Sequence, residues 1–475
     1  MERKSAWEKY TEADLAALEA LAVEYEEFIS QNKTERECVR SIVKAAESAG
    51  YAPLEEAIRL GRQLNAGDKV WATSQNKAVV LVHLGKQPLA QGMNILGAHI
   101  DSPRLDLKQN PLYEKDGLVL LDTHYYGGIK HYQWVAIPLA LHGVVAKTDG
   151  SVVDVVIGED AADPVFCVTD LLPHLGAKQM EKNGKEVVEG EDLDLLVGNR
   201  CAQAVEEAED AKAEKKSDPV KAFTIALLEE KYGISEEDFL SAELEVVPAG
   251  HARDLGFDRS MVIGYGQDDR VCAFTSLKAQ LAAEGIPERT CVCILVDKEE
   301  IGSVGASGME SAFFEHAIAE VMGLADQGGE IALRRALKAS HMLSSDVSAG
   351  VDPAYGFAFE PKNSAYLGRG LVFNKYTGAR GKSGSNDARA EYIARIRRIM
   401  DDADVSFQTA ELGRVDVGGG GTIAYIPARF GMDVIDAGVP VLSMHAPWEV
   451  TSKADVFEAY RGYRAFLAQD LHQFD

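Results

Sequence analysis

Apolar residues near the start of the chain recur at the spacing of an amphipathic helix. The stretch TEADLAALEALAVEYEEFI places Leu15, Leu18, Leu21 and Tyr25 on one helical face. Thr11 stands directly before this pattern, and an acidic residue follows three positions later, as in an N-terminal capping box. The pattern therefore predicts that the chain begins with helices whose apolar face packs on a core.

Short apolar runs without helical period follow. KAVVLVHLG and MNILGAHID are rich in β-branched residues and predict two strands of a first sheet. Toward the C-terminus, runs such as TCVCILV alternate with helical patterns, and several of them end in a residue able to bind a ligand. This alternation predicts an α/β fold with a central mixed sheet flanked by helices.

The middle of the chain has a different character. GVVAKTDGSVVDVVIG contains two β-branched runs around the turn signal TDG, which indicates a hairpin. After the charge-dense segment 204–217, a helix is predicted with Ser217 or Asp218 as its cap and Pro219 in its first turn. We interpret this part as an inserted, β-rich domain. The predicted boundaries are 106–245 for the insert, and 1–105 with 246–475 for the discontinuous remainder.

Length and charge narrow the class of protein. A chain of 475 residues exceeds what one hydrophobic core usually organises, which agrees with an insertion. Its 75 acidic residues against 49 Lys plus Arg give a net charge of −26. Nucleic acid and anionic membranes would be repelled by this charge, so we expect neither as a partner.

The cysteines and the N-terminal sequence indicate in which cellular compartment the protein is expected. None of the six cysteines forms a CxxC pair, which argues against a zinc finger or a disulfide framework. The acid-rich N-terminus lacks the apolar region of a signal peptide, and no apolar run approaches transmembrane length. A reducing cytoplasm is the expected location.

Two adjacent glutamates, Glu299 and Glu300, directly follow the buried-strand pattern TCVCILV and its acid-lysine pair. Acidic pairs are mostly solvated surface. The carboxyl ends of strands in an open α/β sheet, however, are where ligands bind. The position therefore makes the pair a candidate site.

Four further motifs at strand ends carry potential metal ligands. Each has a simple alternative explanation, namely a surface pair, an acidic helix N-terminus, a turn or a core histidine. Together, two histidines and several carboxylates without a thiolate suit a dinuclear zinc-type centre with a shared aspartate bridging the ions. The candidates are His99 with Asp101, Asp268 with Asp269, Asp346 and His445.

Charge balance explains why the glutamates come as a pair. The carboxylates of Asp268, Glu300 and Asp346 offset three of the four positive charges of two divalent ions, and a hydroxide would balance the fourth. Hydrolysis also needs an unligated carboxylate that takes the proton from the attacking water. Neighbouring side chains project in different directions, so one glutamate can bind metal while the other acts as the base.

The motifs AHIDSPRLDLK, GQDDR, DKEEIGS, SSDVSAGVDP and MHAPWEVTSKAD resemble, in this order, those of the aspartyl aminopeptidase and vacuolar aminopeptidase I family of dizinc metallopeptidases. The resemblance extends over nearly the whole chain and is closest to the bacterial branch. It implies an α/β catalytic domain interrupted by a dimerisation domain. It also implies two divalent ions per subunit, with zinc expected and cobalt or manganese as alternatives.

The resemblance assigns roles to individual residues. His99 and Asp346 would bind one ion, and Glu300 and His445 the other. Asp268 would bridge the two ions. Glu299 would be the general base, and Asp101 would orient His99.

The resemblance further implies dimers that assemble into tetrahedral dodecamers with active sites facing an inner chamber. The expected partners are therefore peptides with a free N-terminus. Family members borrow a histidine from a neighbouring subunit to assist at the oxyanion. His174 matches one such histidine, whereas Lys178 replaces a second one expected four residues later.

Substrate preference depends on the stretch LVFNKYTGARGKSGSND. Members that prefer N-terminal Asp or Glu have a lysine in this region, which here supplies Lys375, Arg380 and Lys382. The alternative is that these are solvated loop cations and that neutral or apolar residues are preferred. Gly420, in DVGGGGTIAYI, would let the backbone approach the substrate closely. Two other hypotheses are a carboxypeptidase or deacylase on a related sheet, and a non-catalytic assembly or cargo protein that retains the fold.

Overall fold

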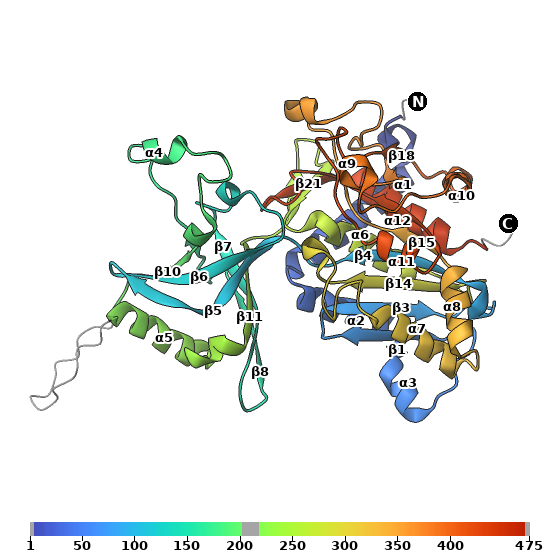
Figure 1. The fold of residues 1–475 in the computed structure, drawn as a ribbon, viewed down its shortest axis with the longest axis horizontal. Helices are drawn as coiled ribbons and strands as arrows, with labels where there is room; N and C mark the ends of the chain where they lie inside the picture. The colour runs from blue at the N-terminus through green and yellow to red at the C-terminus, as the bar shows by residue number, and fades with distance from the viewer. Residues whose placement is uncertain (1–3, 202–217, 471–475) are drawn as a thin grey trace, which may run out of the picture. The chain divides into compact units, whose positions relative to one another are not determined.

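The computed structural model describes residues 4–201 and 218–470 (Figure 1). The chain forms two compact units. The first unit comprises Met1–Ser102, His251–Met444 and Trp448–Asp475, and the second comprises Pro103–Gly250 with His445–Pro447. Within the described ranges, no helix is both long and apolar enough to cross a membrane.

A nine-stranded sheet forms the centre of the first unit. Four of its strands, β14, β4, β15 and β19, run parallel to one another. Strands β3 and β17 lie on either side of this group and run antiparallel to it. The prediction of an α/β fold with a mixed sheet is confirmed. In spatial order the strands are β1 (Ala52–Pro53), β2 (Lys69–Ser74), β3 (Ala78–His83), β14 (Thr290–Val296), β4 (Met93–His99), β15 (His341–Ser344), β19 (Asp433–Gly438), β17 (Leu371–Asn374) and β18 (Phe407–Ala410).

Both faces of this sheet are covered, which explains the continuous apolar runs of its central strands. Every residue of β3, β4 and β14 is buried. Successive residues of β14 alternate between two cores: Cys293 belongs to one and Ile294 to the other. One face carries α1 (Glu12–Gln31), α2 (Glu35–Ser48), α6 (Gln267–Leu281), α10 (Ala390–Asp402) and α12 (Lys453–Leu467). The other carries α3 (Leu54–Leu60), α7 (Phe313–Leu324), α8 (Glu330–Lys338) and α11 (Tyr425–Ala428).

The predicted N-terminal helix is confirmed as α1. The side chain of Thr11 accepts a hydrogen bond from the Asp14 amide, and the Asp14 carboxylate accepts one from the Thr11 amide, which completes a capping box. Leu18, Leu21 and Tyr25 are buried. Leu15 is 40% exposed, because the buried stripe is narrower than the periodicity predicts.

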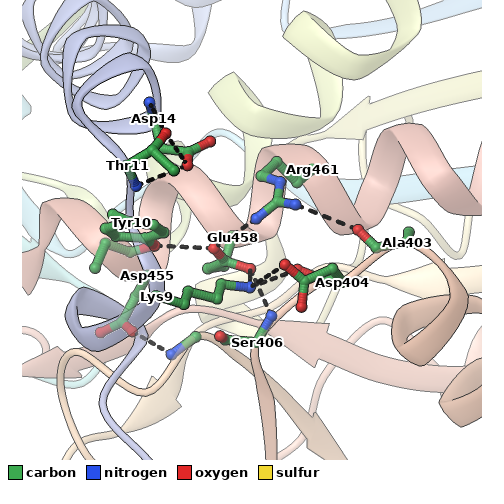
Figure 2. Close-up of polar contacts among 12 residues, drawn as sticks. Lys9, Tyr10, Thr11, Asp14, Ala403, Asp404, Ser406, Asp455, Glu458 and Arg461 are labelled. Atoms are coloured by element: carbon green, nitrogen blue, oxygen red, sulfur yellow. Dashed lines mark hydrogen bonds and ion pairs between the residues drawn. The ribbon is translucent and has the colours of Figure 1, made fainter.

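The segment before α1 is tied to the C-terminal helix through a buried carboxylate, Glu458 (Figure 2). Glu458 accepts hydrogen bonds from Lys9 Nζ at 3.2 Å, Tyr10 Oη at 2.9 Å and Arg461 Nη1 at 3.0 Å. The amide of Ser406 donates a fourth at 2.5 Å. We call these five residues the Glu458 cluster.

A smaller, five-stranded sheet lies in the same unit. Its strand β13 leads into α6, and β21 pairs with β13 so that Glu449 lies opposite Gly264. The strands in spatial order are β12 (Arg253–Leu255), β13 (Met261–Gly264), β21 (Glu449–Ser452), β20 (Pro440–Leu442) and β16 (Ser348–Ala349).

The second unit is built on a seven-stranded antiparallel sheet. The predicted hairpin is confirmed between β7 and β8, where Gly150 adopts a φ of +88°. The predicted helix is α5 (Pro219–Tyr232), with Asp218 at its N-cap; Ser217 and segment 204–217 lie outside the described residues. The strands in spatial order are β8 (Val152–Ile157), β7 (Leu139–Ala146), β11 (Ala242–Pro248), β5 (Arg104–Lys115), β6 (Leu118–Tyr126), β10 (Leu195–Gly198) and β9 (Cys167–Val168).

Candidate metal centre

Strand register brings distant motifs to one edge of the central sheet. β14 and β4 run parallel with Val296 paired to His99, so the residues that follow both strands emerge side by side. β15 runs parallel on the other side of β4, and Asp346 follows it by two residues. The glutamate pair, which forms a short 3₁₀ turn after β14, therefore shares this edge with His99 and Asp346.

The start of α6 adds two aspartates to this edge. Asp268 and Asp269 have non-helical backbone angles, which turn both side chains away from a regular helical path. Asp268 Oδ1 lies 3.2 Å from His99 Nε2. Asp269 Oδ2 accepts a hydrogen bond from the His99 amide at 3.3 Å. His99 is thus contacted by both members of the acidic doublet.

Among the described residues of the first unit, two sets of side chains have the arrangement of a metal site. Each set offers three ligand atoms that all lie within 4.8 Å of one another. The ligands are imidazole nitrogen and carboxylate oxygen without a thiolate, a combination that zinc accepts. The sets are His99 with Glu299 and Glu300, and His99 with Asp269 and Asp346.

The carboxyl groups at this edge are close together and buried, and both effects disfavour their ionised forms. Burial, followed by the charges of Glu299 and Asp269, raises the pKa of Asp346 well above its usual value. Burial and the neighbouring Asp268 likewise raise the pKa of Asp269. A divalent cation would relieve this crowding, since it supplies positive charge where carboxylates converge.

Asp101 connects His99 to the glutamate pair. Asp101 Oδ1 lies 3.2 Å from His99 Nδ1, which leaves Nε2 directed at the acidic side chains. The two carboxylate oxygens also accept the amides of Glu299, at 3.2 Å, and Glu300, at 3.1 Å. Although burial alone would lower it, the pKa of His99 is raised by its contacts with Asp101 and Asp268.

The remaining predicted residues are described within their own units. His174 and His445 belong to the second unit, where His174 is exposed and His445 Nδ1 lies 2.8 Å from the Gly128 carbonyl. In the first unit, the Gly420 amide donates to the Thr377 carbonyl at 3.0 Å, which joins the glycine-rich loop to the segment after β17.

The predicted substrate-binding lysine, Lys375, follows β17 and has a half-exposed side chain. Its Nζ lies 3.6 Å from Asp387, which also pairs with Lys382 at 3.0 Å. Lys382 Nζ stands over the Tyr376 ring, 3.8 Å from its centroid. The side chain of Arg380 is outside the described part of the structure.

Two buried acids at the edge received no role of their own from the sequence. Asp269 could have received one, because it is half of the acidic doublet with Asp268. Asp297 lies two residues before Glu299, is buried and accepts a hydrogen bond from Ser307 Oγ at 2.6 Å. Burial, together with the charges of Glu35 and Asp101, raises the pKa of Asp297 to about 6. No local pattern marks this residue, since its neighbours come from distant segments.

Comparison with known proteins adds an independent line of evidence for the family. The family described as aminopeptidase I zinc metalloprotease (M18) matches residues 28–467. A protein of Clostridium acetobutylicum named a probable M18 family aminopeptidase 1 is 57% identical over 466 residues, 98% of each chain. The crystal structure of an M18 family aminopeptidase from Thermotoga maritima has a TM-score of 0.91 at 42% identity, covering 98% of this chain and 99% of that one.

A more distant likeness concerns the fold alone. The structure of the S. cerevisiae mApe1 dodecamer has a TM-score of 0.74 at 17% identity, covering 94% of this chain and 97% of that one.

Proposed function

The chain belongs to the M18 family of aminopeptidase I zinc metalloproteases, and from this premise we propose how its residues divide the work of hydrolysis. The protein is an aminopeptidase, a zinc-dependent hydrolase of peptide bonds. We propose that its substrates are peptides with a free N-terminus and that it acts in the cytoplasm. The observation that carries the mechanism is the set His99, Glu299 and Glu300, whose ligand atoms lie within 4.8 Å of one another.

The proposed ligand set holds two divalent ions, zinc in the first place, with cobalt or manganese as alternatives. Imidazole and carboxylate donors support this set, as does the crowding of carboxyl groups around Asp346. His445 enters from its sequence motif. His99 and Asp346 would hold one ion, Glu300 and His445 would hold the other, and Asp268 would be shared by both.

Zinc bound in this set supplies a Lewis acid that lowers the pKa of water and polarises the scissile carbonyl. Glu299 takes the proton from the attacking water and passes it to the leaving amine. Its side chain is suited to this role because Oε2 lies 3.9 Å from His99 Nε2, beside the ligand set. Asp101 holds His99 and the amides of both glutamates, so it fixes the base and the ligand relative to each other.

Charges in the loop after β17 bear on substrate preference. Lys375 and Lys382 share the carboxylate of Asp387. A neighbouring cavity of about 210 Å³ is lined by two cations, Lys382 and Arg414, and by two acids, Glu411 and Asp416. Because these charges balance, we propose that the enzyme prefers neutral or apolar N-terminal residues over Asp and Glu, with recognition of acids by Lys375 as the alternative.

We also propose a homo-oligomer in which the second unit mediates dimerisation and dimers assemble into a dodecamer. The family resemblance and the fold shared with the yeast mApe1 dodecamer support this assembly. Light scattering would then give a mass near twelve times 51.5 kDa. If His174 assists across subunits, His174→Ala will lower kcat in the assembled enzyme while leaving this mass unchanged.

The decisive experiment compares wild type with Glu299→Gln on peptides that begin with Asp, Glu, Leu, Met or Lys. Metal-stripped protein is assayed with and without zinc, cobalt or manganese, and an N-acetylated peptide serves as the control substrate. We expect kcat of Glu299→Gln to fall about 10²- to 10⁴-fold while the zinc content stays that of wild type. Glu288→Gln, a surface change at the ion pair with Lys86, should leave kcat unchanged.

Two results would contradict the proposal. The first is turnover by Glu299→Gln at the wild-type rate, which would remove this residue as the base. The second is equal cleavage of the acetylated peptide, which would exclude recognition of a free N-terminus. The ranking of Asp and Glu against Leu and Met decides the preference.

A further inference from the structure

Glu449 is a buried glutamate that has no part in the proposed hydrolysis. It is 1% exposed and begins strand β21. The pairing of β21 with β13 sets it opposite Gly264, just ahead of the turn that carries Asp268. A carboxylate in such a position is costly to bury unless it makes strong hydrogen bonds.

Glu449 is hydrogen-bonded to the start of α6 through its side chain and through its main chain. Its Oε2 accepts the Asp268 amide at 3.0 Å, and its main-chain carbonyl accepts Gln267 Nε2 at 2.6 Å. Gln267 Oε1 in turn accepts Tyr25 Oη at 2.8 Å. The side chain of the residue before Asp268 is therefore also hydrogen-bonded.

The other side of Asp268 is held as well. Ser102 Oγ donates to the Asp268 carbonyl at 2.6 Å. Both main-chain polar groups of Asp268 are therefore hydrogen-bonded to side chains, in a backbone conformation with φ −83° and ψ 105° that no helix would impose. Its carboxylate is left to face His99, with Oδ1 at 3.2 Å from Nε2.

We infer that Glu449 is a positioning residue, which holds the Asp268 peptide so that the Asp268 carboxylate has the orientation needed to bind zinc. This inference rests on the ligand role proposed for Asp268. The competing explanation is structural, namely that Glu449 only satisfies an amide at the start of a helix. A structural role lowers stability, whereas a positioning role lowers zinc affinity beyond what the loss of stability explains.

The test uses two substitutions of Glu449 in the full-length chain. Glu449→Gln keeps an oxygen that can accept the Asp268 amide, whereas Glu449→Leu removes the acceptor. Zinc affinity is measured by competition with a chromophoric chelator, and the thermal midpoint of the metal-free protein is measured in parallel. We expect Glu449→Leu to weaken zinc binding about 10- to 100-fold and Glu449→Gln to restore most of it.

Glu458 provides the matched control. It is equally buried, lies in the same unit and also accepts a main-chain amide, that of Ser406 (Figure 2). Glu458→Gln and Glu458→Leu should lower the thermal midpoint of the metal-free protein but leave zinc affinity within about twofold of wild type. Because the Glu458 variants lose stability at a site away from the proposed ligands, a loss of zinc affinity seen only in Glu449→Leu is not confused with partial unfolding.

Asp268→Asn separates this inference from the proposal on which it rests. Wild-type zinc affinity in Asp268→Asn would overturn the ligand role of Asp268 and the inference with it. Weak binding in Asp268→Asn, with wild-type binding in both Glu449 variants, would overturn the inference alone. So would a loss in Glu449→Leu that is matched by Glu458→Leu at the same thermal midpoint. Loss in Glu449→Leu, rescue in Glu449→Gln and no loss in the controls would support it.

Discussion

Buried carboxylates occur in two regions of the first unit, the Glu458 cluster and the edge that carries His99. In the cluster, Lys9, Tyr10 and Arg461 direct hydrogen-bond donors at one carboxylate (Figure 2). At the edge, the charges nearest to Asp346 are mainly those of other acids, which raise its pKa. A buried acid surrounded by donors from its own chain stabilises the fold, whereas converging acids indicate that a cation comes from outside.

The largest effect on stability is expected from Glu458→Leu. The substitution removes the buried carboxylate and leaves the partly buried charges of Lys9 and Arg461 without their shared partner, which should cost about 3–5 kcal/mol of unfolding free energy. Denaturant unfolding of the metal-free protein measures this. Glu391→Leu, at a mostly exposed position on α10, is the control and should cost less than about 0.5 kcal/mol. Similar losses in both variants would break the comparison.

Asp346→Asn should raise the stability of the metal-free protein and lower the stability of the zinc-bound protein, each relative to wild type. In the metal-free protein it removes one acid from a crowded group, so the unfolding midpoint should rise slightly. Zinc at 100 times its Kd should stabilise wild type by about 3 kcal/mol, and this gain should largely vanish in the variant. Unfolding with and without zinc tests both signs. A metal-free variant less stable than wild type would indicate that Asp346 is satisfied by the chain alone.

Asp455 is a third buried acid, and its effect on stability should depend on pH. Burial raises its pKa to about 8, although it accepts the amides of Gly368 and Gly370. The folded protein therefore keeps a proton that the unfolded chain loses above about pH 4, so this group's contribution to stability falls as pH rises from 4 to 8.

Asp455→Asn removes this titration. Relative to the variant, wild type should lose about 2.6 kcal/mol of unfolding free energy between pH 5 and pH 7. Denaturant unfolding of both proteins at the two pH values measures the difference. Parallel profiles would mean that Asp455 ionises in the folded protein as it does in the unfolded chain.

The smallest effect is expected at the capping box of α1. Thr11→Ala removes the acceptor for the Asp14 amide and should cost about 1 kcal/mol. The effect should stay below that of Glu458→Leu, because Glu458 rather than the cap holds the preceding segment to α12. Thermal unfolding checks the order, with Ser48→Ala at the exposed end of α2 as the control.

Local patterns predicted the elements well where neighbours along the chain decide the structure. The helix over Leu18, Leu21 and Tyr25 and the hairpin at Gly150 depend on periodicity and turn chemistry within a few residues. The alternation of strand and helix patterns predicted the α/β fold class, and the resemblance supplied the family. Leu15 lies in the predicted helix but is exposed, since the width of a buried stripe depends on what packs against it.

The interior partners of the site could not be read from local patterns. The role inferred for Glu449 depends on the register of β21 against β13, which sequence periodicity does not contain. Asp297 carries a raised pKa only because Glu35 and Asp101 come close in the fold. The position at the end of a buried strand directed attention to the glutamate pair, but the contacts that hold the pair come from Asp101.

The position of β14 between β3 and β4 also orders events during synthesis. β4 leaves the ribosome early, yet its neighbour β14 is made roughly 200 residues later, a delay of about 10–40 s at typical elongation rates. Until then, His99 has no glutamate pair beside it. The aminopeptidase therefore leaves the ribosome without an assembled active site during the time when its own N-terminus is newly exposed.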